Sequence, residues 1–114
     1  MTDDRKKRIT DSFPDKYEEM RLNLKLTSLE FEKLKQGIYA SSTEEKWNIF
    51  LFENEMIWSR SWTDYCIYKV SYVQLNGGIE LRAMKVSRNP DEYDSTDLNF
   101  DFGIFKKMLN FYLL

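Results

Sequence analysis

The sequence contains no histidine, and Cys66 is its only cysteine among 114 residues. Histidine is the commonest general base and metal ligand, and structural zinc sites are completed by cysteine. Zinc chemistry, a Cys–His pair and a Ser–His–Asp triad therefore cannot be assembled within this chain. A single cysteine also excludes an internal disulfide. We expect no catalytic residues, no metal and no cofactor.

Long apolar runs, glycine-rich phosphate loops and an excess of charge are also missing. No run approaches the roughly 18 apolar residues of a membrane span, and no apolar secretory segment begins the chain. We therefore expect a cytoplasmic protein with no membrane partner. Lys plus Arg number 17 and Asp plus Glu 19, so the net charge of −2 does not favour nucleic acid as a partner. Neither a GxGxxG motif nor a P-loop occurs.

A stretch rich in aromatic and β-branched residues, 46–74, contains all three tryptophans. Such residues fit a pleated, half-buried surface. We predict three consecutive antiparallel strands at 47–52, 56–63 and 65–73, with a turn at Glu53-Asn54. The turn Asn76-Gly77-Gly78 then leads into a fourth strand, 79–86. The apolar parity of this strand changes after Ala83, which predicts a β-bulge.

The N-terminal part is expected to begin with a flexible, solvated segment, 1–12, followed by a single domain, 13–114. Strict alternation at 21–26 predicts a short edge strand. Thr27 and Glu30 form the pattern of a capping box, so we predict a helix over 28–36 that ends at Gly37. The polar segment 38–45 links this helix to the sheet.

The C-terminal residues 98–112 predict a helix with two apolar stripes. The stripe that should cover the sheet consists of Leu98, Phe102, Phe105, Leu109 and Tyr112. The second, a candidate interface, consists of Phe100, Ile104, Met108 and Phe111. The second stripe needs the 28–36 helix, another copy of the chain or a different protein to cover it. The fold we predict is α+β: an antiparallel meander sheet of four to five strands, with a short N-terminal helix and a C-terminal helix packed on one face.

One group of polar and aromatic residues has the composition of a ligand site. It comprises Arg60, Ser61, Trp62, Thr63, Arg88, Asn89 and Tyr93. A guanidinium between indoles can stack on them and still fork to a phosphate or carboxylate. The same residues also suit a structural Arg–Trp stack tied to Asp64 or Asp91, and the sequence leaves both interpretations open.

Three further groups favour structural interpretations. The acidic loop 91–97 lacks the glycine and terminal glutamate of a calcium loop, so we interpret it as a solvated loop with a helix cap. Cys66 lies within a predicted strand and is expected to be an inert core thiol. Tyr65, Tyr68 and Tyr72 could form a base-stacking platform, but we interpret them as core residues.

The segments 38–40, 46–50 and 58–68 resemble a family of small uncharacterised bacterial domains. In that family an aromatic strand leads into Arg-Ser-Trp-Thr-Gly and then an Ile-Tyr strand; here Arg60-Ser61-Trp62-Thr63 carries the likeness. This chain departs from the pattern at Ser59, where a histidine is common, and at Asp64, where a glycine is common. The resemblance implies a bacterial or phage origin and no established activity. It also implies relatives beside ADP-ribose-processing enzymes, which makes an ADP-ribose-type ligand the one to test.

Two functions remain as hypotheses from the sequence. The first is a non-enzymatic binding or protein-interaction domain, self-associating or partner-binding through the C-terminal helix. The alternative is a nucleotide- or phosphate-binding domain that uses Arg60, Trp62 and Arg88. Binding of single-stranded nucleic acid is the least favoured.

Overall fold

The computed structural model describes residues 1–42 and 44–113 of the chain. Thr43, within the predicted link 38–45, and Leu114, the end of the predicted domain 13–114, lie outside the described residues. In chain order the elements are α1 (Asp3–Asp11), β1 (Tyr17–Thr27), α2 (Ser28–Gln36), β2 (Trp47–Phe52), β3 (Glu55–Arg60), β4 (Cys66–Leu75), β5 (Gly78–Ser87) and α3 (Leu98–Leu113).

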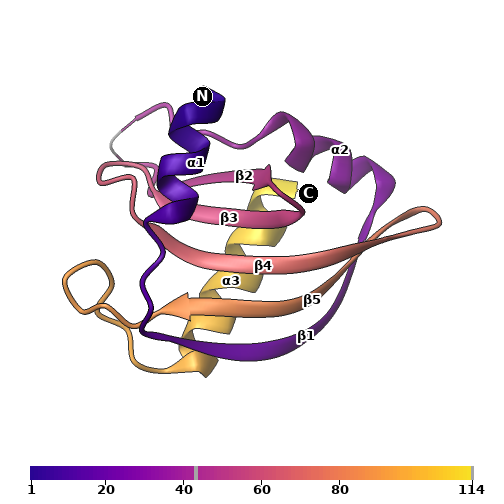
Figure 1. Cartoon of the computed structure of the whole chain (residues 1–114). Coiled ribbons are helices and arrows are strands. Elements are labelled where there is room, and N and C mark those ends of the chain that lie inside the picture. Colours follow the sequence, from indigo (N-terminus) through magenta and orange to yellow (C-terminus); the bar gives the residue numbers. More distant parts are fainter. Residues whose placement is uncertain (43, 114) are drawn as a thin grey trace.

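The five strands form one antiparallel sheet in the order β1-β5-β4-β3-β2 (Figure 1). Strands β2 to β5 are a meander of consecutive hairpins, and β1 joins the outer edge of β5. Because β1 and β2 lie at opposite edges, the segment containing α2 must cross the sheet. The predicted α+β fold with an antiparallel meander is confirmed.

The hairpin turns form where the sequence places residues that tolerate positive φ. Glu53 and Asn54 have φ values of 50° and 65°. A two-residue hairpin turn of type I′ requires positive φ at both of its central residues. Gly77 has φ 86°, and a Cβ at Gly78 would overlap the carbonyl oxygen of Leu26. Both predicted turns are confirmed.

The predicted bulge near Ala83 is also present. Ala83 pairs with Ser71 and Leu81 pairs with Tyr72, so Arg82 is the extra residue on β5. The extra residue lets Leu81 and Met84 both join the main core.

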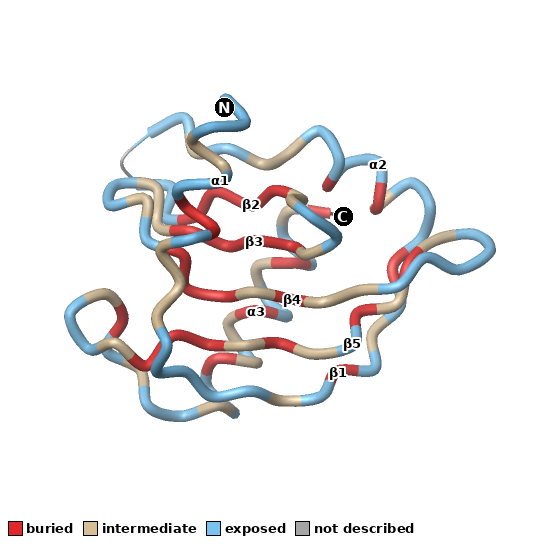
Figure 2. The backbone as a smooth tube through the Cα atoms, viewed as in Figure 1, coloured by how far each residue is buried: buried red, intermediate tan, exposed pale blue. Residues whose placement is uncertain are grey.

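Helices α2 and α3 contribute to the main core on one face of the sheet. Phe31 and Leu34 of α2 and Phe105 and Leu109 of α3 belong to a single buried cluster with the sheet. The capping box at the start of α2 is complete, since Thr27 and Glu30 bond each other's backbone N–H groups at 3.2 and 2.8 Å. The buried residues concentrate in the central strands (Figure 2).

The N-terminal segment requires a correction, because the expected flexible stretch 1–12 contains helix α1. This helix covers the opposite face of the sheet from α3 (Figure 1). Ile9 is fully buried there in a small cluster with Phe50, Ile57 and Cys66. Asp3, Asp4, Lys7 and Arg8 are exposed on α1. The helix docks through the buried Ile9 and through Arg5, which bonds Asp64. The helices are therefore not all on one face. Among the described residues, no helix is long and apolar enough to cross a membrane.

Candidate functional site

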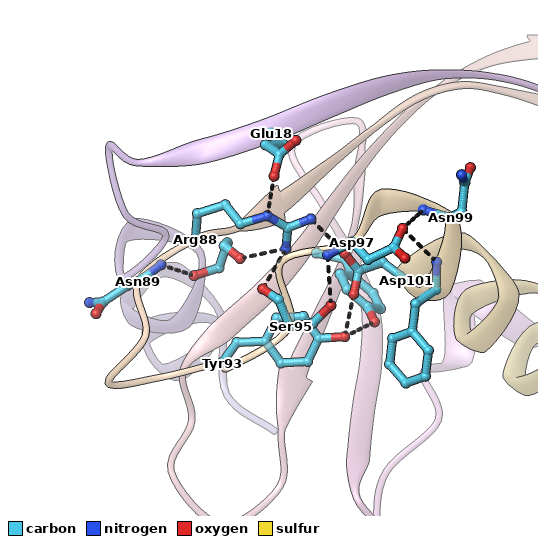
Figure 3. Close-up of polar contacts among 11 residues, drawn as sticks. Glu18, Arg88, Asn89, Tyr93, Ser95, Asp97, Asn99 and Asp101 are labelled. Atoms are coloured by element: carbon cyan, nitrogen blue, oxygen red, sulfur yellow. Dashed lines mark hydrogen bonds and ion pairs between the residues drawn. The ribbon is translucent and has the colours of Figure 1, made fainter.

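A buried polar cluster joins the end of β5 to the first turns of α3 (Figure 3). The Arg88 guanidinium donates through Nε to Glu18 Oε1 at 2.6 Å and through Nη2 to Asp101 Oδ2 at 2.7 Å. Its Nη1 donates to the carbonyl oxygens of Ser87 and Ser95 at 3.2 and 3.1 Å. Every nitrogen of this guanidinium therefore has a protein acceptor, which is the arrangement of a structural ion pair.

Two tyrosine hydroxyls extend this cluster into the core. Tyr93 donates its hydroxyl hydrogen to Asp101 Oδ1 at 2.7 Å, and the hydroxyl oxygens of Tyr68 and Tyr93 lie 2.8 Å apart. Burial raises the pKa of Tyr93 to about 12, and it raises the pKa of Tyr68 still further. Both hydroxyls are therefore protonated near neutral pH, and neither serves as a base there.

Arg60 lies within a cage of aromatic rings. It ends β3 directly opposite Trp47 on β2 in the register of the sheet. Its guanidinium carbon lies 4.3 Å from the ring centre of Trp47 and 5.4 Å from those of Trp62 and Tyr93. The ion pairs formed among the described residues do not include Arg60. The cage therefore holds a cation whose charge no described carboxylate neutralises.

Trp62 reaches this cage because β3 ends earlier than the sequence indicates. The predicted strand 56–63 stops at Arg60, and the Asp64 N–H closes a turn by donating to the Arg60 carbonyl oxygen at 3.0 Å. Asp64 adopts φ 62°, which a strand does not allow. Trp62 consequently leaves the sheet and remains 59% exposed beside the guanidinium.

The cage opens into a groove of about 600 Å³ between α3, the segment before β2 and the loop after β5. We call it the α3 groove. Its apolar side consists of Trp47, Tyr93, Phe100, Ile104, Met108, Phe111 and Tyr112. Its charged lining residues are Glu44, Glu45, Lys46, Arg60, Asp94 and Lys107.

The α3 groove brings together two groups that the sequence analysis treated separately. Arg60 and Tyr93 from the candidate ligand site line it, and so do all four residues of the second apolar stripe. Phe100 and Phe111 of that stripe are 57% and 73% exposed. The surplus stripe and the caged arginine therefore belong to one concave surface.

The other candidate site residues do not line the groove. Arg88 is committed to the buried cluster, and its side chain is only 6% exposed. Ser61 donates to the Glu45 carbonyl oxygen, and Thr63 accepts a hydrogen bond from the Tyr65 N–H. Asn89 accepts from the Asp91 N–H. Arg60 and Arg88 are linked only indirectly. Arg60 lies over the ring of Tyr93, and Arg88 bonds Asp101, which accepts a hydrogen bond from the Tyr93 hydroxyl. The two arginines do not share an open site.

Asp101 and Glu18, the acidic partners of Arg88, were not predicted from the sequence. Asp101 is fully buried on α3, four residues before the core residue Phe105. A carboxylate on the stripe that faces the sheet needs a buried partner. That position was the available signal, whereas nothing in the sequence distinguishes Glu18 from the neighbouring charges of β1.

This chain departs from the pattern of the family it resembles at Ser59 and Asp64. Both residues lie on or beside the face of the sheet that α1 covers. Ser59 is fully buried opposite Asn48 and Cys66, and its Oγ has no hydrogen-bond partner among the described residues. Asp64 accepts two hydrogen bonds from Arg5 of α1, at 2.9 and 2.7 Å. Neither residue lines the α3 groove.

No group of three or more His, Cys, Asp or Glu side chains within residues 1–42 and 44–113 is placed to hold a metal ion. The chain matches no protein-family model, and no curated protein or solved structure is detectably similar to it.

Proposed function

We propose that this protein is a small binding domain without catalytic activity, and that it holds its partner in the α3 groove. The observation that carries the proposal is the position of Arg60. A caged guanidinium without a described counter-ion lies at the head of a mostly apolar concave surface. Ligand sites combine apolar walls with a small number of placed polar groups in this way.

The exposure of the groove's apolar wall supports the same proposal. Phe100 and Phe111 stand more than half exposed on α3, whereas Phe105 of the same helix is fully buried. Contiguous exposed apolar surface normally marks a site that another molecule covers.

A non-catalytic role agrees with the chemistry of the lining. The groove contains no cysteine or histidine, and Tyr93, its one hydroxyl beside Arg60, has a pKa raised to about 12 by burial. Arg60 supplies a fixed positive charge, and we interpret the lining carboxylates of Glu44, Glu45 and Asp94 as binding groups rather than catalytic ones.

Fluorescence of 1-anilinonaphthalene-8-sulfonate tests the proposal, because this dye carries an aromatic body and one anionic group. We expect saturable binding to the folded protein and loss of most of the signal in Phe111→Ser. Leu29→Ser is the matched control, since Leu29 is 71% exposed on α2 and does not line the groove. Equal dye binding by both variants, with unchanged thermal midpoints, would remove the groove as the binding surface.

Self-association is the second candidate function, favoured by the exposure of Phe100 and Phe111 on one side of a helix. Two copies could cover each other's stripes with a two-fold symmetric contact. Sedimentation velocity at several concentrations tests it. A wild-type dimer that becomes a folded monomer in Phe111→Glu supports it, and a wild-type monomer at every concentration rejects it. Ile104 and Met108 are only partly exposed and pack against the core, so they are less suitable positions for the charge.

A further inference from the structure

We infer that the ligand of the α3 groove is a small monocarboxylate with an apolar body, bound through the guanidinium of Arg60. The inference rests on the proposed function and adds the chemical class of the ligand. The lining residues determine which charge and shape of anionic group the groove accepts.

Aromatic rings hold the guanidinium of Arg60 in place. Aromatic rings lie 4.3 to 5.4 Å from its guanidinium carbon. Contacts of this kind stabilise the cation and fix the plane of the group. The five N–H donors of a guanidinium lie in that plane as a fork. A planar carboxylate that accepts two parallel hydrogen bonds matches this fork.

The lining of the α3 groove carries both positive and negative charges. Three cations line the groove: Lys46, Arg60 and Lys107. Glu44, Glu45 and Asp94 line it as well, so the formal charges of the described lining residues cancel. A lining without net positive charge compensates one negative charge through Arg60 but offers no surplus cation for a second or third. Because like charges repel, the three carboxylates make each further negative charge less favourable, and the lining favours a monoanion over a phosphate ester or a nucleotide.

Arg88 is not available to bind a phosphate group in the groove. Arg88 has its nitrogens committed to Glu18, Asp101 and two carbonyl oxygens. Phosphate sites usually gather several donors around three strongly accepting oxygens. Arg60 remains as the one arginine among the described lining residues, and one planar fork suits one carboxylate.

The second apolar stripe of α3 suits a ligand with an apolar body. Phe100, Ile104, Met108 and Phe111 follow one side of α3 over roughly 16 Å at 1.5 Å per residue. They present aromatic and aliphatic surface with no hydrogen-bonding side chains. Burying an alkyl or aryl group against this side stabilises the complex, because it removes apolar surface from water.

Octanoate, 1-octanol and octyl phosphate test the inference, because they share one apolar body and differ in the polar group. Titrations followed by backbone amide shifts give both the affinity and the location. We expect octanoate to shift the groove amides and to bind at least about tenfold more tightly than 1-octanol, since hydrogen bonds between charged groups are stronger than those of a neutral hydroxyl. Octyl phosphate, largely a dianion at pH 7.5, should bind more weakly than octanoate.

Three variants assign the effect to named side chains. Arg60→Gln should reduce the preference for octanoate over 1-octanol to about threefold or less, and Arg60→Lys should restore only part of it. Arg82→Gln is the matched control, because Arg82 is an exposed arginine on β5 outside the groove. Asp94→Asn should raise the affinity for octyl phosphate by about two- to fivefold while changing octanoate less.

The outcomes separate this inference from the proposed function. Octyl phosphate or ADP binding more tightly than octanoate would overturn the carboxylate assignment. So would an equal octanoate preference in wild type and Arg60→Gln, with both proteins folded. If the dye experiment succeeds and octanoate does not shift the groove amides, the binding domain stands and only the ligand class fails.

Discussion

Arg88 and Asp101 form a buried ion pair with Nη2 and Oδ2 2.7 Å apart and side chains that are 6% and 0% exposed. Arg88 directly follows β5, and Asp101 lies in the first turn of α3. The pair therefore fixes the start of α3 against the sheet. Since α3 provides the apolar wall of the groove, the pair also determines where that wall stands relative to Arg60.

Asp101→Ala should lower the free energy of unfolding by about 3–5 kcal/mol, because it leaves the buried Arg88 charge without its fully buried partner. Urea denaturation monitored by circular dichroism measures this. Glu80→Gln is the control: it breaks the more exposed pair with Arg82 and should cost about 1 kcal/mol or less. A loss below about 1 kcal/mol for Asp101→Ala would show that the buried pair contributes little.

Tyr93→Phe should separate stability from binding. The variant removes the hydroxyl that bonds Asp101 and Tyr68, so we expect a loss of about 1–3 kcal/mol of unfolding free energy. The ring beside Arg60 is retained, and dye binding by the folded variant should stay within about twofold of wild type. Loss of dye binding without loss of stability would contradict this division of roles.

The ion pair between Asp64 and Arg5 predicts a pH-dependent contribution of α1 to stability. The hydrogen bonds from Arg5 hold the pKa of Asp64 below its usual range. A carboxylate with a lowered folded-state pKa stabilises the fold above its unfolded pKa, near 4. The contribution is lost as the pH falls through the folded-state pKa.

Asp64→Asn tests this with little change to the backbone, since asparagine also tolerates positive φ. We expect the variant to be about 1 kcal/mol less stable than wild type at pH 7, with a difference that shrinks as the pH falls below about 4. Denaturant unfolding at several pH values checks the difference. A stability gap that does not shrink on acidification would mean that the charge of Asp64 is not responsible.

Reactivity of Cys66 should report whether α1 is docked. The thiol is fully buried in the cluster with Ile9, and this burial raises its pKa well above the usual range. Native protein should therefore react slowly with a thiol reagent such as dithionitrobenzoate. Ile9→Ala should open a cavity, cost about 2–5 kcal/mol, and accelerate labelling.

Lys7→Ala is the control for that experiment, because Lys7 lies on the exposed side of α1 and makes only a surface ion pair with Asp11. Its labelling rate should match wild type. Fast labelling of wild-type protein, at a rate similar to that of the denatured chain, would show that α1 does not cover Cys66 in solution.

The sequence predicted those elements whose signals are local. The capping box of α2, the positive-φ turn at Glu53-Asn54 and the parity change near Ala83 each depend on a few adjacent residues. The wide apolar stripe of α3 is also local, because helical periodicity alone shows that one side is in excess. These features appear in the structure at or near the expected positions.

Helix α1 and the early end of β3 could not be predicted in the same way. A charged segment with one buried isoleucine carries little periodic signal, and its docking depends on Phe50 and Ile57 from distant strands. Asp64 ends β3 through a turn that is stabilised by Arg5, 59 positions away in the chain. Both outcomes depend on contacts between residues that are remote in sequence.

The sequence by itself determined the class of fold, the lack of histidine chemistry and the presence of Arg60 among aromatic residues. Only the tertiary structure decided how the two arginines differ. Arg88 meets Asp101 in the first turn of α3 and is buried, whereas the packing of α3 leaves Arg60 beside an uncovered apolar stripe. Composition and spacing do not distinguish Arg88, which is paired, from Arg60, which forms no ion pair with a residue that the structure describes. The difference arises from which carboxylates the folded chain brings within hydrogen-bonding distance.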